Sequence, residues 1–173
     1  MKFNFVGYGS LVSHKSLRET VTDKKFRLVC IKGFKRIFDI EEKRGDVLNI
    51  LPSRKDKFNG VMFKLDKDEM RKMKRRENGY KMVETNVFDF KTRKSLGRAL
   101  VAEDLNYEID HSKRLPSKAY FILCREAAYH ISRNFGSMWD KTTFISNGQI
   151  VSSWIKRHPE FDTINLKRSV LRF

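Results

Sequence analysis

The sequence is poor in cysteine and contains no long hydrophobic run. Only Cys30 and Cys124 are present among 173 residues, and both have aliphatic neighbours. We therefore expect two buried free thiols, and neither a disulfide nor a cysteine nucleophile. No segment approaches the roughly 18 consecutive apolar residues that a membrane-spanning helix needs, so no membrane association is expected. The apolar stretch before Gly7 is too short for a signal peptide, and we expect a cytoplasmic protein.

Several chemical motifs are also missing. The four histidines, at positions 14, 111, 130 and 158, are isolated, and no His-x-x-x-His or Cys-x-x-Cys pair occurs. The spacing therefore predicts no metal site, and no motif calls for a cofactor. The glycine-rich stretch near the N-terminus lacks the third glycine of a dinucleotide fingerprint and the Gly-Lys-Ser/Thr of a P-loop. Ser153 and Lys156 fit a Ser-x-x-Lys pattern whose companion motifs are absent, and we attribute the match to chance.

Acidic residues are few compared with basic ones. The 21 Asp and Glu residues stand against 37 Lys and Arg residues, which gives a formal net charge of +16. Such an excess attracts anions, from small acidic metabolites to nucleic acid. The basic residues are scattered, with short clusters at 71–76 and 167–168, and they form no tail-like block. A solvated basic surface is the first interpretation, and a nucleic-acid patch is the second.

The sequence does contain enough apolar material for one globular core. Hydrophobic residues make up 40% of the chain, and 14 phenylalanines are distributed along it. A chain of this length buries roughly 70% of the surface that it exposes when unfolded. No repeat, low-complexity tract or linker rich in proline and glycine interrupts it. Residues 1–173 are therefore predicted to form a single domain.

Most of the first hundred residues have the pattern of β-strands. Residues 2–6 precede a glycine-rich turn, after which Ser10 or Ser13 is suited to cap a short helix. Two apolar runs within 27–40 meet at Gly33, which predicts a long bent strand or two strands joined at a bulge. Further strands are predicted at 47–51, 60–65, 80–90 and 96–101, with the polar residues 53–57 separating the first two.

Helical patterns occupy shorter stretches. Asp66 and Glu69 have the spacing of a capping box, and the helix that they begin is predicted to end near residues 78–79. From Ser117 to Phe135, apolar residues recur at steps of three and four, which predicts an amphipathic helix. A further short helix is predicted within 160–172. Strands thus dominate the first two thirds and helices the last third, so the predicted fold class is α+β.

The turn Gly7-Tyr8-Gly9-Ser10-Leu11 joins a predicted strand to a predicted helix. Two glycines allow successive backbone N–H groups to face one point, which is the arrangement of an anion or oxyanion site. An ordinary strand-to-helix turn has the same pattern, and from spacing alone it is the simpler interpretation. Ser10 also lacks the Gly-x-Ser-x-Gly setting of a nucleophile.

Several short motifs follow this turn in a fixed order. They are Gly33-Phe34-Lys35-Arg36, Asn49 to Ser53, Gly60 to Phe63, Arg76-Glu77 before Gly79-Tyr80, Pro116 to Tyr120, and the stretch from Phe135 to Thr143. In this order they resemble the gamma-glutamylcyclotransferase-like family over about residues 3–145. The glycine-rich turn combined with Arg-Glu-x-Gly-Tyr is the most specific part of the resemblance.

The resemblance implies a small mixed β-barrel flanked by α-helices, and an enzyme that splits a γ-glutamyl compound into 5-oxoproline and an amine. The substrate's own α-amine attacks the γ-carbonyl, so positioning supplies much of the rate. The protein adds a base, donors for the oxyanion and an anchor for the α-carboxylate. By resemblance, Glu77 matches the catalytic acid/base, Tyr8, Gly9, Ser10 and Leu11 match the loop that binds the γ-glutamyl group, and Tyr80 and Tyr120 match aromatic positions near the pocket.

Without the resemblance, Glu77 is one more charge in a basic run. Burial would make its carboxylate more basic, whereas flanking Arg75 and Arg76 have the opposite effect unless they point to solvent. Tyr80 and Tyr120 fit a core as well as a pocket. The leading hypothesis is a γ-glutamyl cyclotransferase acting on glutathione, a γ-glutamyl amino acid or a γ-glutamyl amine. The alternative is a non-catalytic relative of the same fold that binds nucleic acid or another polyanion.

Overall fold

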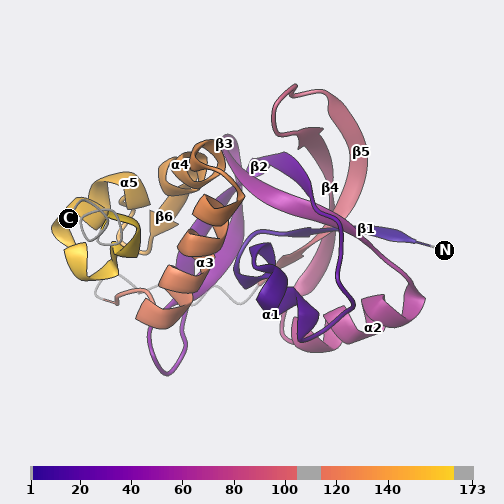
Figure 1. The fold of residues 1–173 in the computed structure, drawn as a ribbon, viewed down its shortest axis with the longest axis horizontal. Coiled ribbons are helices and arrows are strands. Elements are labelled where there is room, and N and C mark those ends of the chain that lie inside the picture. Colours follow the sequence, from indigo (N-terminus) through magenta and orange to yellow (C-terminus); the bar gives the residue numbers. More distant parts are fainter. Residues whose placement is uncertain (1, 105–113, 166–173) are drawn as a thin grey trace, which may run out of the picture.

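The computed structural model describes residues 2–104 and 114–165. Figure 1 shows how the strands and helices of this part of the chain are arranged. The strands are β1 (Phe3–Gly7), β2 (Arg27–Ile40), β3 (Val47–Leu65), β4 (Lys81–Asp89), β5 (Ser95–Glu103) and β6 (Thr143–Ile145). The α-helices are α1 (His14–Arg18), α2 (Lys67–Arg76), α3 (Lys118–Ile131), α4 (Arg133–Thr142) and α5 (Val151–Trp154), and the 3-10 helices are η1 (Ser10–Val12), η2 (Ile155–Arg157) and η3 (Pro159–Phe161).

The strand pairings form a ring. β3 pairs antiparallel with both β1 and β2, β1 pairs parallel with β5, and β4 joins β5 to β2 through two antiparallel pairings. The order β1–β5–β4–β2–β3 therefore returns to β1, and β6 adds to β2 in parallel outside this ring. The expected α+β class and barrel-like sheet are confirmed.

Helices cover the ring in two groups. In Figure 1, α3, α4 and α5 gather near β6, whereas α1 and α2 lie toward the N-terminal strand β1. Phe38 of β2 packs against Phe121 of α3 with ring centroids 5.4 Å apart, and both side chains are fully buried. Trp139 of α4 joins the same cluster, 5.8 Å from Phe121. The apolar face of α3 thus anchors the helical group to the sheet.

The two longest strands show where the hydrophobic pattern was informative and where it was not. Gly33 has a φ of +88°, and the β2–β3 register shifts between Lys32 and Phe34, so the predicted bulge is confirmed. The prediction of separate strands at 47–51 and 60–65 was wrong, because β3 is continuous through its polar middle. The register changes from Lys32 opposite Lys57 to Phe34 opposite Pro52, so the polar residues between them bulge out of the ladder. Such a bulge has the same composition as a loop.

The capping box of α2 is confirmed. The Asp66 carboxylate accepts hydrogen bonds from the backbone N–H groups of Asp68 and Glu69, both at 2.9 Å, and the Glu69 carboxylate accepts one from Asp66 N at 3.0 Å. Of the two serines proposed to cap the first helix, Ser13 does so by accepting a hydrogen bond from Ser16 N at 3.4 Å. The N-terminal ends of α1 and α2 are therefore both capped by side chains that are near them in the sequence.

The predicted helix from Ser117 to Phe135 was wrong in its length. α3 ends at Ile131, Ser132 is extended with a φ of −170°, and its hydroxyl caps α4 by accepting from Phe135 N at 3.1 Å. Apolar residues continue at helical spacing from α3 into α4, because both helices pack on the same core. The helix predicted within 160–172 lies partly outside the described residues.

Cys30 and Cys124 are both buried and form no disulfide, as expected from their aliphatic neighbours. Within residues 2–104 and 114–165, no three His, Cys, Asp or Glu side chains are grouped as metal ligands, and His111 lies outside these ranges. None of the described helices combines the length and the apolar character that crossing a membrane requires.

Candidate active site

The turn after β1 folds back on itself so closely that two positions have no room for a side chain. A Cβ atom added to Gly7 would lie 2.6 Å from the Cβ of Leu11, and one added to Gly9 would lie 2.5 Å from the Tyr120 hydroxyl oxygen. Both distances are below the 3.0 Å that real Cβ atoms keep. The glycines are therefore required by close packing, and the second one brings the turn against α3.

The turn continues directly into η1. The N–H of Val12 donates to the carbonyl of Gly9 at 3.1 Å, and this bond closes the 3-10 turn. The first N–H groups of a helix have no acceptor within the helix, and no side chain caps this end. The backbone amides of Ser10 and Leu11 are therefore suited to bind an anionic or carbonyl oxygen.

Glu77 is the residue at which α2 ends. Its N–H donates to the Met73 carbonyl at 2.9 Å, and its own carbonyl accepts from Tyr80 N at 3.0 Å. Gly79 has a φ of +94°, a conformation that glycine adopts without steric cost, and it lets the chain reverse between the helix and β4. This turn fixes Glu77 and Tyr80 close together, and the Glu77 side chain is 18% exposed.

All seven residues predicted for the site lie around one cavity. Tyr8, Gly9, Ser10 and Leu11 come from the turn after β1, Glu77 and Tyr80 from the end of α2, and Tyr120 from α3. The end of β1 (5–7) completes the wall together with Leu48 of β3 and Ala102 of β5. The cavity has a volume of about 30 Å³. That is room for one or two water molecules, so a larger group enters only when a lining side chain moves.

The surroundings of Glu77 shift the pKa of its carboxyl group upward. Burial raises the pKa of Glu77, and the positive charge of Arg76 opposes this effect without cancelling it. The Arg76 guanidinium lies 3.5 Å from the Glu77 carboxylate. It donates to the Ser16 carbonyl at 2.7 Å, to Thr20 Oγ1 at 2.9 Å and to Ser10 Oγ at 3.2 Å. Arg76 therefore faces the α1 region and fixes the Ser10 hydroxyl, while Arg75 is exposed.

The three tyrosines have different surroundings. The Tyr8 hydroxyl donates to the Ala102 carbonyl at 2.8 Å, so its side chain ties β1 to β5 and only its backbone remains for a ligand. The Tyr80 hydroxyl makes a longer hydrogen bond of 3.4 Å to the Leu48 carbonyl. Burial raises the pKa of all three tyrosines, including Tyr120, so each hydroxyl stays neutral at physiological pH.

Sequence reasoning missed the role of Arg36, which lies beneath the turn. Its guanidinium donates to the Asn59 carbonyl at 2.6 Å, to Thr143 Oγ1 at 2.8 Å and to the Tyr8 carbonyl at 3.4 Å. The residue is fully buried, and desolvation lowers its pKa to about 9. The Gly-Phe-x-Arg motif contains this arginine, but the motif alone does not show which groups the arginine contacts. Arg36 links the turn to β3 and to the start of β6.

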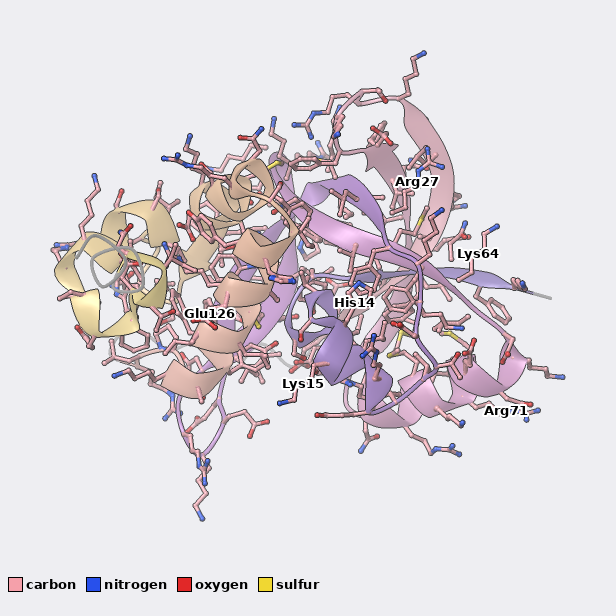
Figure 2. All side chains as sticks on the ribbon, viewed as in Figure 1. His14, Lys15, Arg27, Lys64, Arg71 and Glu126 are labelled. Atoms are coloured by element: carbon pink, nitrogen blue, oxygen red, sulfur yellow. The ribbon has the colours of Figure 1, made fainter. Side chains whose placement is uncertain are left out.

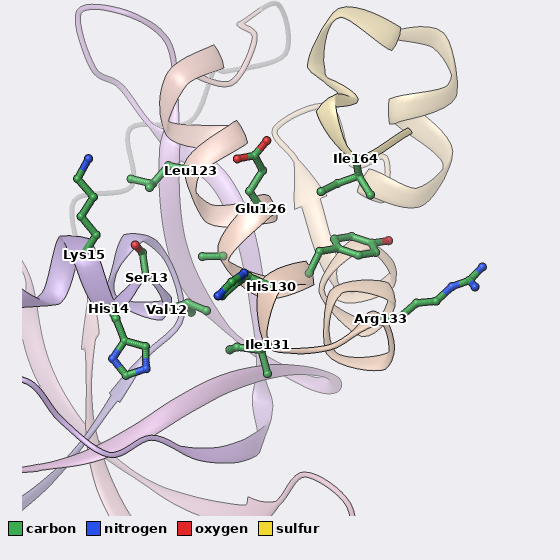
Figure 3. A pocket seen from close by; sticks show the side chains of 12 residues that line it. Val12, Ser13, His14, Lys15, Leu123, Glu126, His130, Ile131, Arg133 and Ile164 are labelled. Carbon is green, nitrogen blue, oxygen red and sulfur yellow. The ribbon is translucent and has the colours of Figure 1, made fainter. Parts of the chain in front are cut away.

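A much larger groove, of about 600 Å³, lies between α1 and α3. Figure 3 shows His14 and Lys15 on one side of it, and Glu126 and His130 on α3 on the other. None of the residues predicted for the site lines this groove. The small cavity, and not this wider groove, therefore contains the candidate site.

The closed ring with its flanking helices is the fold of gamma-glutamylcyclotransferase-like proteins. Within that class, the family model described as "ChaC-like protein" matches residues 4–130, and the chain belongs to the ChaC-like family. A search of curated proteins found no match.

Solved structures share the fold at low sequence identity. One described as a gamma-glutamyl cyclotransferase has a TM-score of 0.70 and 17% identity, and the alignment covers 91% of this chain and 99% of that one. An uncharacterized protein from Homo sapiens has a TM-score of 0.68 and 19% identity, with 80% and 86% covered. An AIG2-like protein from Mus musculus has a TM-score of 0.51 and 17% identity, with 61% and 79% covered. These similarities establish the fold.

Proposed function

We propose that the protein is a γ-glutamyl cyclotransferase that converts a γ-glutamyl compound into 5-oxoproline and a free amine. The substrate classes that we propose are glutathione, γ-glutamyl amino acids and γ-glutamyl amines. The observation that supports this most directly is the position of Glu77, whose largely buried carboxyl group lines the same cavity as the amides of the glycine-rich turn. The family of the chain and the fold that it shares with a gamma-glutamyl cyclotransferase point to the same chemistry.

In the proposed reaction, Glu77 takes a proton from the α-ammonium group of the substrate. The neutral amine then attacks the γ-carbonyl carbon, and a five-membered ring closes around a tetrahedral intermediate. Attack leaves two hydrogens on the ring nitrogen. Glu77 gives its proton to the departing nitrogen as the carbon–nitrogen bond breaks, and it then takes one hydrogen from the ring nitrogen and passes it to the released amine, which leaves as an ammonium. The ring nitrogen ends as a lactam N–H, and no net proton is gained or lost. A raised pKa suits both steps, because the carboxylate must accept a proton and the carboxyl group must donate one.

The turn supplies the electrostatic part of the mechanism. We assign the backbone amides of Ser10 and Leu11 to the oxygen that becomes negative as the ring closes. Arg76, 3.5 Å from Glu77, adds positive charge that attracts the substrate's α-carboxylate. Arg36 acts as a positioning residue, since it holds the carbonyl of Tyr8 from below. The positive charge of Arg76 also lowers the pKa of Glu77, but the burial of Glu77 raises it by more.

A cavity of about 30 Å³ must widen to admit a γ-glutamyl group. Tyr80 is the side chain that we expect to move. It is half-buried, and only a 3.4 Å hydrogen bond to Leu48 holds its hydroxyl. Tyr8, by contrast, is buried, and its 2.8 Å hydrogen bond connects two strands. Tyr80 would then close over the substrate and exclude water from the reacting groups.

The test is to incubate the purified protein with representatives of the three substrate classes and to quantify 5-oxoproline. Glu77→Gln should lower kcat by about 10²- to 10⁴-fold, which is the usual contribution of a general acid/base. Glu84→Gln is the matched control, because this glutamate lies on β4 with a side chain that is 51% exposed and is paired with Arg98. The control should keep wild-type activity.

Two results would contradict the proposal at different levels. If the folded protein produces no 5-oxoproline from any of these compounds, the proposed activity is wrong. If the protein is active and Glu77→Gln is as active as Glu84→Gln, the activity stands and the assignment of the base is wrong. Circular dichroism of both variants separates loss of chemistry from loss of fold.

A further inference from the structure

A groove of about 550 Å³ runs beside β1, β3 and the segment that leads into β2. It shares no residue with the cavity around Glu77. Of its nine lining residues among those that the structure describes, five are cationic and none is acidic. The cationic residues are Lys2, Lys24, Lys25, Arg27 and Lys64. Five of the 37 basic residues of the chain therefore line this one groove.

Strand register places several of these side chains on one face of the sheet. Asn4 of β1 is opposite Lys64 of β3, and Arg27 of β2 is opposite Met62 of β3. Paired residues share a face, and so do residues two apart on one strand, so these four side chains project on the same side. Phe63, between them, points the other way and is buried. Figure 2 shows Arg27 and Lys64 at the same end of the molecule, beside β1.

Three of the five cations have no acidic partner among the residues that the structure describes. Lys24 forms an ion pair with Glu69, and Arg27 lies 3.6 Å from Asp89. Lys2, Lys25 and Lys64 are exposed, and none forms an ion pair with a carboxylate of residues 2–104 or 114–165. Uncompensated charges of one sign along a groove attract and concentrate the opposite charge. The groove is therefore suited to an anionic ligand.

This groove lies next to the larger one between α1 and α3. Phe26 lines the basic groove and stacks on His14, with ring centroids 3.8 Å apart and planes inclined by 14°. His14 in turn lines the α1–α3 groove together with Lys15 and Arg133. The stacked pair is thus the shared boundary of the two grooves. Lys2, Lys24, Lys25, Arg27 and Lys64, the cations of the basic groove, form the basic track.

We propose that this basic track binds single-stranded nucleic acid through its phosphates. A site for one small phosphate group usually has fixed backbone amides, whereas the donors that line this groove are mainly lysine and arginine side chains. Lysine and arginine side chains that are spaced along a groove suit the regularly spaced phosphates of a nucleic-acid backbone. The half-buried Phe26 offers an apolar contact to a base without selecting a sequence. This binding is independent of the proposed cyclotransferase activity.

The test is fluorescence anisotropy with a labelled single-stranded oligothymidylate in 50 mM salt and at several higher concentrations. Lys25→Glu combined with Lys64→Glu changes two unpaired cations of the track. Lys43→Glu combined with Arg44→Glu is the matched control, since both residues are exposed in the β2–β3 turn and line neither groove. Both double variants lower the net charge by the same amount. Thermal unfolding of each confirms that the fold is intact.

We expect the wild type to bind and its affinity to fall steeply with salt. Losing two phosphate contacts should weaken binding roughly 50-fold at 50 mM salt and flatten the slope of log K against log[salt] by about 1.4. The control should change affinity only a few-fold. The proposal is overturned if the wild type does not bind, or if both double variants lose affinity equally, which would indicate net charge alone. Stronger binding to duplex DNA or to anionic lipid vesicles than to the single strand would also overturn it.

Discussion

The contact between Gly9 and Tyr120 gives a quantitative test of the site geometry. In Gly9→Ala, the new Cβ would lie 2.5 Å from the Tyr120 hydroxyl oxygen, against a closest normal approach of 3.0 Å, so the two groups must separate by at least half an ångström. Tyr120 is held on α3 between the core and the cavity, so the shift is not free. Overpacking of this kind costs about 1–3 kcal/mol.

Removing the hydroxyl should relieve this cost. With Tyr120→Phe in place, the nearest remaining atoms to the new Cβ are the ring carbon Cζ at 3.6 Å and the Leu48 Cδ1 at 3.7 Å, both ordinary contacts. Gly9→Ala should therefore destabilise the Tyr120→Phe protein by about 1–2 kcal/mol less than it destabilises the wild type. Other effects of the alanine are common to both backgrounds and cancel in the double-mutant cycle.

The assay is urea unfolding of the four proteins, followed by tryptophan fluorescence. Trp139 and Trp154 are both buried, so their emission should report the loss of the core. For a chain of this size, each kcal/mol corresponds to about 2–4 °C in Tm, so thermal unfolding gives a second measurement. Additive effects of the two substitutions would show that the hydroxyl does not limit the space at Gly9, and the described geometry of the turn would be wrong.

Three further predictions concern the pH dependence of stability, the helix cap and the buried ion pairs. Because burial raises the pKa of Glu77 above its ordinary value of 4.5, the folded protein holds this proton more tightly than the unfolded chain does, and stability should fall as the pH rises from about 4.5 through the raised pKa. Glu77→Gln should flatten this fall in urea unfolding at stepped pH, and an unchanged pH profile would contradict it. Asp66→Ala should lower the free energy of unfolding by about 1 kcal/mol in the same assay, because it removes the cap of α2. An unchanged urea midpoint would show that the cap does not stabilise the protein. Arg125→Met should cost about 3–5 kcal/mol, since it leaves the buried Asp140 without its 2.8 Å ion pair, and a loss below 1 kcal/mol would refute this.

Local chemistry explains the parts of the fold that could be predicted from the sequence. Gly33 interrupts two apolar runs, and the positive φ that it adopts is one that other residues avoid, so a bulge was foreseeable. The capping box was visible because Asp66 and Glu69 satisfy each other's backbone over three residues. Such signals depend only on neighbours in the chain.

The errors arose where a distant partner decides the structure. The polar residues of β3 between Pro52 and Lys57 remain within the strand because they bulge opposite Gly33 of β2, and no local pattern carries that information. Ser132 separates α3 from α4 although the apolar spacing continues across it. In both cases the hydrophobic pattern was correct about which side chains are buried, and it did not report the path of the backbone.

The candidate site was predictable as a set of residues but not as a set of roles. The resemblance brought the turn and Glu77 together, and the cavity contains them all. The resemblance could not show that the Tyr8 hydroxyl donates a hydrogen bond to the Ala102 carbonyl, or that Arg76 donates to Ser10 and Thr20. These contacts join residues more than 50 positions apart. They depend on how the ring closes, which a sequence motif does not encode.

The hydrogen bond from Tyr8 to Ala102 has a consequence for the time at which the protein acquires its cavity. The two residues are 94 positions apart, and β1 cannot pair with β5 until that strand has been synthesised. At roughly 5–20 residues per second, Ala102 is made about 5–20 s after Tyr8. During this interval the N-terminal turn already exists as a segment but has no wall on its β5 side. A polypeptide released before β5 would therefore carry Glu77 and the whole turn, and we expect it to lack the cavity that joins them.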